Sequence, residues 1–517
     1  MTLLARSGKP SSPNEASARP PSAASRSRTA SLLFILFAGA IARLYDIGGL
    51  PADHHYFRQT QTLGTIVEFW RHGVDFLHPI MASMGKPGVL VLEFPLYQAI
   101  VASLYHVITP SVIVARVVTI AASVAAAYFV YKITQLFYAG REPLYAAAFF
   151  LFTPLSIFYG RVPMLDMLEI MLCVGFMYYL AAYIVGGKST KYLVVGSLVA
   201  CAAFTVKPPY AAPVFVALLY LCWITYGKRP KVGVVISMLV PVLAMFLWQR
   251  YANATNSLYQ AQYPYKDLAY AIQVKLVPPN TWYFGTLAQR LQLGNYAKLF
   301  VRVLAGILAG AGAIPLVVGL MTRIEERDRM FYVWLAAVLG SFFVFFNLNV
   351  VHDYYQMPLL PVVAVFCARG LQLIEDGLRI RLSNSAVAIS LTAFWVVYAA
   401  CVCGVMWKVG YFRPLASTQV TAGQEMSRVL TDDSLVAVST PSGDLWDPTI
   451  LYFADKRGFT VPQARLDQGM LSYLRQSGVR WLVVTDGGAL IPPPTQSLLR
   501  SMTVGPRAST LTIYRLQ

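Results

Sequence analysis

Long apolar runs recur along most of the chain, and they restrict its fold more than any other feature. A helix needs roughly 20 mostly apolar residues to cross a bilayer. Hydrophobic residues make up 57% of the chain and charged residues only 13%, which excludes an ordinary water-soluble globule. We therefore predict a mainly α fold, a polytopic membrane helical bundle. The runs, about eleven in all, are 31–49, 111–137, 144–159, 167–185, 191–206, 211–226, 232–249, 301–321, 330–346, 355–373 and 386–407.

Basic residues in the short connectors indicate which way these runs face. If the basic segment 1–30 lies in the cytoplasm, the positive-inside rule is obeyed, because the cytoplasmic side then also receives 139–143, 186–191, 227–231, 322–329 and 375–381. This arrangement requires the shorter apolar stretch 94–108 to be an interfacial or re-entrant helix instead of a span. The outer face then receives 50–110, 159–167, 205–210, 250–300, 351–355 and everything after about residue 410.

The same pattern divides the chain into three regions. Residues 1–30 are rich in Ser, Ala, Pro and Arg, and we expect a disordered cytoplasmic tail. Residues 31–409 form the membrane domain, with a large first outer loop at 50–110. Residues 410–517 form a small extracytoplasmic α/β domain, in which we predict strands at 434–440, 480–486 and 510–516 and a helix at 466–478. No motif assigns this domain more than a capping role or a contact with a partner.

The net charge of +18 does not indicate a nucleic-acid partner. Lys and Arg are concentrated in the tail and the connectors, which is the pattern that orients a membrane protein. We therefore expect the lipid bilayer, and no nucleic acid, among the partners of this chain.

Acidic side chains stand out in the outer connectors. Asp53 follows the first apolar run directly, and Asp166 lies in "GRVPMLDM" between two further runs. An ionised carboxylate is costly to bury unless it is paired or used, and one that faces a wet cavity can act as a general base. For an isolated acid, a solvated loop residue is the more common interpretation, and it is the presence of a second acid that favours a functional one. If the two converge on the outer face, they form a catalytic site.

Cations fall on the same face and suit a phosphate near the membrane surface, because Arg and Lys neutralise its charge. Proline follows both lysines of this set, so each lies at a helix break where backbone amides are also free. The alternative for each is a cation that extends along the membrane interface. The candidate donor-phosphate ligands are Lys86, Lys207, Arg161, Arg58 and His352.

Histidines and tyrosines supply the remaining candidates. In the first outer loop, His54, His55, His72 and His78 could hold a divalent metal together with Asp53, but no metal-binding spacing such as HExxH is present. We predict no metal ligand and no firm cofactor, with a divalent metal left open. The segment "HDYYQMPLLP" (352–361) is either an aromatic belt at the membrane surface or a sugar-binding platform. The candidate substrate-binding residues are His54, His55, Tyr354 and Tyr355.

Five short blocks in order resemble a known family. They are "DHHYFRQTQT" (53–62), "EFPLYQAIVASLY" (93–105), "YGRVPMLDML" (159–168), "VKPPY" (206–210) and "HDYYQMPLLP" (352–361). Together they are similar to bacterial membrane glycosyltransferases of the GT-C fold, in the branch of dolichyl-phosphate-mannose protein mannosyltransferases and aminoarabinose transferases. Relatives often carry a second acid beside the first, where this chain has His54.

The resemblance implies an activity. Such enzymes transfer a sugar from a polyprenyl-phosphate donor to a glycan, lipid or protein acceptor, here at the outer face of a bacterial inner (plasma) membrane. Asp53 would take the acceptor proton as general base, and the anomeric configuration would invert while polyprenyl phosphate leaves. Asp166 would position the acceptor or tune the base. The outward cations would stabilise the departing phosphate.

A transporter or flippase of lipid-linked sugars is the main alternative, because it would also need cations near a phosphate. A transporter must open its site to both faces, whereas the notable polar residues here are all assigned to the outer one. A phosphotransferase would show a more compact cluster of His and Arg. The one-sided pattern favours the glycosyltransferase.

Overall fold

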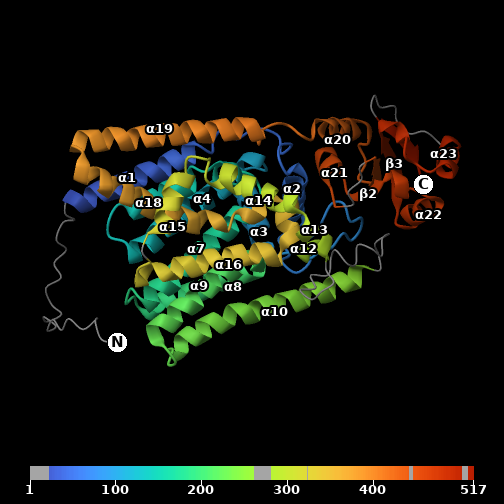
Figure 1. The fold of residues 1–517 in the computed structure, drawn as a ribbon. Coiled ribbons are helices and arrows are strands. Elements are labelled where there is room, and N and C mark those ends of the chain that lie inside the picture. The colour runs from blue at the N-terminus through green and yellow to red at the C-terminus, as the bar shows by residue number, and fades with distance from the viewer. Residues whose placement is uncertain (1–22, 261–280, 323, 442–445, 503–510) are drawn as a thin grey trace.

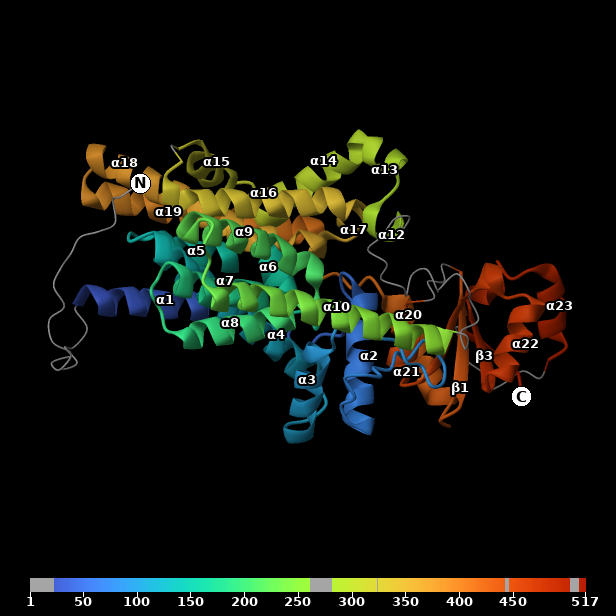
Figure 2. The same cartoon turned by 90° about the horizontal axis from the view of Figure 1, so that it is seen from below.

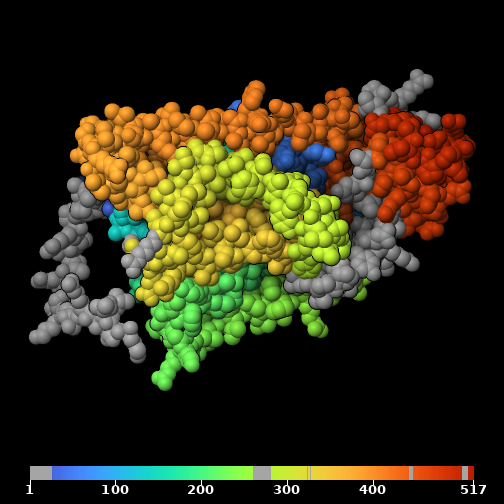
Figure 3. Space-filling model, viewed as in Figure 1, coloured from blue at the N-terminus to red at the C-terminus, as the bar shows by residue number. Residues whose placement is uncertain are grey.

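Helix α7 (Asp166–Ile184) forms the centre of a helical bundle because it is apolar around its whole surface. In its most apolar stretch 83% of residues are buried, against 17% for α19 (Asn384–Val409), which runs along the outside (Figures 1 and 2). The structure is a computed structural model and describes residues 23–260, 281–322, 324–441, 446–502 and 511–517. Figure 3 shows α19 in orange along one edge and the C-terminal domain in red as a lobe at one end.

Five helices of the described chain are long and apolar enough to cross a membrane. They are α4 (Val112–Phe137), α7, α9 (Pro208–Tyr226), α10 (Val232–Gln260) and α19. Three shorter apolar helices accompany them, α5 (Glu142–Leu151), α8 (Thr190–Val206) and α16 (Arg329–Val344). The prediction of a mainly α, multi-pass membrane bundle is confirmed, and the count of about eleven spans stays a prediction.

Several predicted runs are interrupted where Pro or Gly breaks the helix. The run 144–159 divides into α5 and α6 (Pro154–Tyr159), and Thr153 caps the second helix by accepting the Ser156 amide. The run 301–321 becomes the end of α14 (Leu293–Arg302), the π-helical turn η1 (Val303–Ile307) and α15 (Ala313–Met321). The third break separates α17 (Phe346–Val351), the 3₁₀ turn η3 (Asp353–Gln356) and α18 (Leu359–Arg381). The remaining short elements are α12 (Thr281–Phe284) and α13 (Leu287–Leu291), which precede α14 in the chain, and η2 (Glu326–Asp328), which follows α15.

The first helix corrects the expected tail. Helix α1 (Ala23–Ile41) begins before residue 31, so residues 23–30 are helical and not part of a disordered segment. The rest of the predicted tail, residues 1–22, lies outside the described chain, as does the 261–280 part of the predicted outer connector 250–300.

The first outer loop contains two helices that cross the direction of the bundle (Figure 2). They are α2 (Tyr56–His72), which was not predicted, and α3 (Leu96–Val107). Helix α3 has 12 residues, which is about 18 Å and too short to cross a bilayer. Its length agrees with the prediction that the stretch 94–108 does not span the membrane.

The C-terminal domain is a four-stranded sheet with helices around it. Its elements in chain order are α20 (Ser417–Val429), β1 (Leu435–Thr440), α21 (Thr449–Ala454), β2 (Gly458–Pro462), η4 (Gln463–Arg465), α22 (Gln468–Gln476), β3 (Val479–Thr485), η5 (Asp486–Gly488), α23 (Pro493–Arg500) and β4 (Leu511–Arg515). The strand order is β2-β1-β3-β4, with β1 parallel to β2 and β3, and β4 antiparallel to β3. Val438 pairs with Thr460 and Val483, which sets the register. The predicted strands and helix are present, and β2 was missed.

This domain packs on the first outer loop. Gly85 donates its amide to the Gly458 carbonyl at 2.7 Å, and Gly458 donates to Ala82 at 2.9 Å. A side chain at Gly85, which has a φ of +65°, would overlap the ring of Phe459. The Thr60 hydroxyl of α2 lies 3.1 Å from that of Thr449 in α21. The sheet is therefore held against the loop that carries Asp53.

Candidate active site

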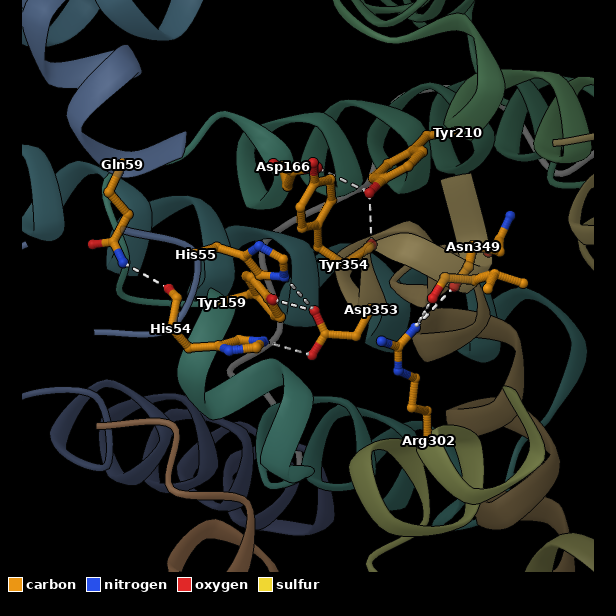
Figure 4. A network of polar contacts seen from close by, with 11 residues as sticks. His54, His55, Gln59, Tyr159, Asp166, Tyr210, Arg302, Asn349, Asp353 and Tyr354 are labelled. Atoms are coloured by element: carbon orange, nitrogen blue, oxygen red, sulfur yellow. Dashed lines mark hydrogen bonds and ion pairs between the residues drawn. The ribbon is translucent and has the colours of Figure 1, made fainter. Parts of the chain in front are cut away.

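Side chains from four separate segments meet at the end of the bundle that carries the C-terminal domain (Figure 4). The segments are the start of the first outer loop, the connector before α7, the break between α8 and α9, and the break before α18. The Tyr210 hydroxyl lies 2.9 Å from Asp166 and 2.6 Å from the Tyr354 carbonyl, which joins two of these segments. On the other side, Gln59 joins Asp53 to the His54 carbonyl, and the His54 ring contacts Asp353, which precedes Tyr354 in the chain. The two predicted acids thus lie in one cluster that is joined partly through the backbone.

Asp53 is held in a buried ion pair. Its Oδ2 accepts a hydrogen bond from Arg161 at 2.8 Å, and its Oδ1 accepts one from Gln59 at 2.5 Å. Burial raises the pKa of Asp53, and the Arg161 charge and the Gln59 hydrogen bond offset this only in part. The carboxylate is fixed in orientation and is more basic than an ordinary aspartate.

Arg161 corrects one sequence interpretation. Its side chain is fully buried, donates to the carbonyls of Tyr45 and Asp46 at 3.1 and 2.8 Å, and stacks on the ring of Phe412. Since both terminal nitrogens, Nη1 and Nη2, are already used inside the protein and the side chain is buried, we assign Arg161 to holding Asp53 and not to binding a phosphate.

Asp166 and Lys207 form the second buried pair. The Lys207 ammonium lies 2.5 Å from Asp166 Oδ1, and Asp166 begins α7, where the helix dipole favours a carboxylate. Lys207 lies between α8 and α9 because Pro208 starts a new helix. Three tyrosine rings surround its ammonium group within 4.2 to 4.8 Å, those of Tyr210, Tyr354 and Tyr355.

Asp353 is the centre of the third group, and sequence reasoning did not select it. His54 and His55 approach its carboxylate at 3.1 and 2.9 Å, and the Tyr159 hydroxyl donates to it at 2.5 Å. Burial alone would raise the pKa of Asp353, but the hydrogen bonds and charges of both histidines outweigh this effect and hold it well below its usual range. His55 has a left-handed φ of 56°, uncommon outside glycine.

This third group corrects the sequence-based grouping of possible metal ligands. Among the described residues, His54, His55 and Asp353 offer ligand atoms within 4.8 Å of one another, so these three could hold a divalent metal. His72 and His78 do not join them, because they pair with Glu68 and Asp75 at 3.3 and 3.0 Å. Asp53 does not join them either, since it is bound to Arg161.

His352 lies against the site without carrying a charge. Its ring stacks on Tyr354 with centroids 5.0 Å apart and lies 5.4 Å from the ring of His55. Burial, and then the nearby charges of His55, Lys207 and Arg58, lower the pKa of His352 to about 3. At neutral pH it would offer a phosphate a hydrogen bond and no positive charge.

The two remaining cations differ in position. Arg58 forms an ion pair with Glu93, also donates to Gln61, and is one of the charges felt by His352. Lys86 is exposed, and its neighbours Gly85 and Pro87 bind Arg457 of the C-terminal domain. In the described chain Lys86 makes no hydrogen bond, ion pair or cation–π contact with the other candidates. The structure therefore does not bring Lys86 into the site.

Sequence reasoning missed several partners, although each lies inside a block that it had singled out. Gln59 follows Asp53, Glu93 opens "EFPLYQ", and Asp353 stands between His352 and Tyr354. The one available signal was a charged or amide side chain within an outer connector. Glu93 pairs with Arg58 across 35 residues and Asp353 with His54 across 299, which no local pattern reports, whereas Gln59 lies only six residues from Asp53.

Solved structures of glycosyltransferases share this fold. ArnT from Cupriavidus metallidurans, bound to undecaprenyl phosphate, aligns with a TM-score of 0.62 and 14% identity over 95% of this chain and 98% of its own. The archaeal oligosaccharyltransferase AglB from Archaeoglobus fulgidus, in complex with an inhibitory peptide and a dolichol-phosphate, aligns with a TM-score of 0.57 and 12% identity. The alignment covers 88% of this chain and 69% of AglB. The mycobacterial arabinofuranosyltransferase AftD aligns with a TM-score of 0.57 and 12% identity, over 95% of this chain and 40% of AftD.

These three similarities show the fold of the chain, which is the GT-C fold. No protein-family model matches the sequence, and no curated protein matches it either.

Proposed function

We propose that this protein is an inverting glycosyltransferase that moves a sugar from a polyprenyl-phosphate donor to an acceptor hydroxyl. The observation that carries the proposal is the pair of buried acid–cation contacts, Asp53 with Arg161 and Asp166 with Lys207, at one end of a GT-C bundle. Two such pairs in one cluster supply a fixed base and a fixed cation within the same site.

The donor class is taken from the similar structures. ArnT was solved with undecaprenyl phosphate and AglB with a dolichol-phosphate, and we extend this class of lipid phosphate to the present chain. The Lys207 ammonium has three N–H donors, and Asp166 is the carboxylate that it contacts. The remaining N–H donors of Lys207, together with the guanidinium of Arg58, can bind the phosphate oxygens.

In the proposed reaction Asp53 is the general base. The acceptor hydroxyl gives its proton to the Asp53 carboxylate while its oxygen forms a bond to the anomeric carbon. The bond from that carbon to the phosphate oxygen breaks on the opposite face, and its electron pair leaves with the polyprenyl phosphate. Lys207 and Arg58 stabilise the negative charge that develops there. Asp166 positions Lys207, and His54, His55, Tyr354 and Tyr355 surround the substrates.

We place the site on the extracytoplasmic face of a bacterial inner membrane. The reason is that the basic stretches 227–231, which follows α9, and 375–381, which ends α18, are expected in the cytoplasm, and the site lies at the opposite ends of these two helices. The C-terminal domain then lies outside the cell membrane, next to the site.

The test is a transfer assay with purified, reconstituted protein and a panel of polyprenyl-phosphate sugars. Wild type is compared with Asp53→Asn, which keeps the shape but removes the base, and with Asp376→Asn, an exposed acid of α18, as matched control. We expect Asp53→Asn to lower kcat by about 10²- to 10⁴-fold and the control to match wild type. Undiminished transfer by Asp53→Asn would contradict the role of Asp53. No transfer with any donor would favour the transporter or flippase.

A further inference from the structure

Asp353 differs from other buried acids in the side chains that it contacts. Asp353 is 6% exposed, and in the described chain its carboxylate contacts two histidines and a tyrosine hydroxyl but no Arg or Lys. A buried carboxylate needs a compensating positive charge, which here must come from the histidines or from a bound cation. Four other buried acids each form an ion pair with an Arg or a Lys, and they are Asp53, Asp166, Asp328 and Glu375.

Both imidazoles point toward the Asp353 carboxylate (Figure 4). Side chains of successive residues in an extended chain point to opposite faces, but here the chain turns at His55, which has a left-handed φ of 56° and a ψ of 35° directly before α2. The Nε2 atoms of His54 and His55 lie 3.1 and 2.9 Å from the carboxylate, and the two ring centroids are 4.3 Å apart. Such a backbone conformation is retained where the surrounding structure requires it, and ligand sites are common examples.

Protonation of both histidines would not suit this arrangement. Two positive charges on rings 4.3 Å apart repel each other, and together they exceed the charge of the single acid. A divalent cation bound by all three side chains compensates the carboxylate and leaves both imidazoles neutral, which is the form in which His binds a metal. The metal-free alternative is one protonated histidine, and a measurement of zinc binding distinguishes the two.

The three side chains supply a ligand set that suits zinc. One ligand atom from each lies within 4.8 Å of the other two, and two ligands of a tetrahedral zinc ion lie roughly 3.3 Å apart, so small side-chain movements are sufficient to bind the ion. Zinc sites with two His and one carboxylate keep a coordination position open, whereas Mg²⁺ and Ca²⁺ prefer oxygen ligands. The Tyr159 hydroxyl donates to Asp353 Oδ1 and fixes the orientation of this carboxylate. The side chain of His54 is 29% exposed, which gives an ion access to the cluster.

Gln59 connects this cluster to Asp53. The Gln59 side-chain amide donates to the His54 carbonyl at 2.9 Å and to Asp53 Oδ1 at 2.5 Å. An ion that fixes the His54 ring therefore also restrains the short segment that carries Asp53.

We propose that His54, His55 and Asp353 bind one divalent transition-metal ion of the zinc type, and that this ion holds the segment of Asp53 in place. The metal site goes beyond the proposed function, since an ion can bind here whichever reaction the site performs. The effect of the ion on Asp53 rests on the proposed function.

The first experiment titrates the full-length, reconstituted protein with Zn²⁺ after treatment with a chelator, using a purification tag without His or Cys. The proposal predicts saturable binding of one zinc ion per chain, with no competition from an equal concentration of Mg²⁺. X-ray absorption should show imidazole nitrogen and carboxylate oxygen ligands at about 2.0–2.2 Å. No saturable binding, sulfur ligands from the cysteines, or equal competition by Mg²⁺ would overturn the site.

The second experiment removes single ligands. Loss of a group that only supports a ligand costs roughly 10- to 100-fold in metal affinity, which we expect for Tyr159→Phe. His54→Gln removes a ligand and should cost about 100-fold or more. The matched control is His78→Gln, because His78 is an exposed histidine of the same loop that pairs with Asp75, and it should bind zinc as wild type does.

Thermal unfolding confirms that the variants are folded. Zinc should raise the Tm of wild type and of His78→Gln but not that of His54→Gln, because an ion stabilises only a protein that binds it. Equal zinc affinity in His54→Gln and wild type would overturn the assignment of the ligands.

Transfer kinetics test the second part of the proposal. Removal of zinc from wild type should lower kcat about tenfold or more with the donor KM unchanged, and His54→Gln should show the low kcat with or without zinc. Zinc binding without any change in kcat would overturn the effect on Asp53.

The outcomes separate this inference from the proposed function. Zinc bound by these three side chains in a protein that transfers no sugar from any donor would overturn the transferase and keep the metal site. Sugar transfer by a protein that binds no zinc would overturn the metal site and leave the glycosyltransferase in place.

Discussion

Buried ion pairs lie at both ends of the helical bundle, and the two ends differ in how far their polar groups are satisfied. At the end away from the C-terminal domain, Glu375 accepts hydrogen bonds from Tyr145, Arg379 and Arg141 at 2.5, 2.6 and 3.0 Å. Asp328 is bound by Arg369 at 3.0 Å and by Tyr138 at 2.5 Å. We call these seven residues the basal network.

The candidate site differs because several of its buried polar atoms have no hydrogen-bond partner in the described chain. These atoms are Oδ2 of Asp166, Oε1 of Gln59, Nδ1 of His352 and both side-chain polar atoms of Gln356, a buried residue that ends η3 three positions after Asp353. An unpaired buried polar atom costs about 1–3 kcal/mol. The site therefore retains hydrogen-bonding capacity that a ligand can use. In the basal network the corresponding groups already bind one another and thereby join helices.

The two groups are far enough apart to be tested separately. Helix α18 begins at Leu359, directly after the site, and Glu375 lies 16 residues further along, which is about 24 Å. We expect substitutions in the basal network to change stability and substitutions in the site to change ligand binding.

The largest effect should follow from Arg369→Met in the basal network. It leaves Asp328 buried without its cation, which should lower the free energy of unfolding by about 3–5 kcal/mol. Denaturant unfolding in micelles measures this, with Arg381→Met at the exposed end of α18 as control. Undecaprenyl phosphate should bind to the folded variant as it does to wild type. A variant as stable as the control would show that the basal network is not structural.

The next largest effect should follow from Lys207→Met. Truncation of one partner of a buried charge pair costs about 2 kcal/mol or more, so the affinity for undecaprenyl phosphate should fall roughly 30-fold or further. A lipid-binding titration measures it. The double variant Lys207→Met with Asp166→Asn removes the uncompensated acid and should restore stability without restoring affinity. Wild-type affinity in both variants would exclude Lys207 as a phosphate ligand.

Arg58 should contribute less, because Glu93 and Gln61 already share its guanidinium. Arg58→Gln should weaken binding of undecaprenyl phosphate about tenfold. Glu93→Gln, the matched substitution of its partner, should leave binding unchanged or strengthen it, because it frees the guanidinium. Weaker binding in Glu93→Gln than in Arg58→Gln would reverse this assignment.

Substitution of Lys86 should have the smallest effect. It distinguishes the sequence-based prediction, in which Lys86 binds the donor phosphate, from the structure, in which Lys86 lies outside the site. Because its side chain is exposed, Lys86→Met should change the affinity for undecaprenyl phosphate by less than about twofold. A tenfold loss in the same titration would mean that the 85–88 loop moves to the donor phosphate, as the sequence suggested.

The sequence was a good guide wherever a local pattern carries the information. Apolar runs predicted the bundle, and short β-branched stretches predicted β1 and β3. The acids Asp53 and Asp166 stood out because a charged side chain beside an apolar run is costly. Strand β2 was missed because "GFTVP" begins with Gly and ends with Pro, both weak strand formers, and it is stabilised by pairing with β1.

The pairing of the charges could not be predicted in the same way. Arg161 and Lys207 have the same sequence signature, a cation in an outer connector. Arg161 is fully buried next to Asp53, whereas Lys207 lies against the tyrosine rings of the site. The difference arises from which helices pack together, and this is a property of the whole fold.

The most direct test of the account is a structure of the protein in a lipid bilayer with bound undecaprenyl phosphate. The account predicts phosphate density within hydrogen-bonding distance, about 3 Å, of the Lys207 ammonium group, with the guanidinium of Arg58 beside it and the previously unpaired atoms of the site engaged. Phosphate density at the basal network, or at any place away from Lys207, would contradict it.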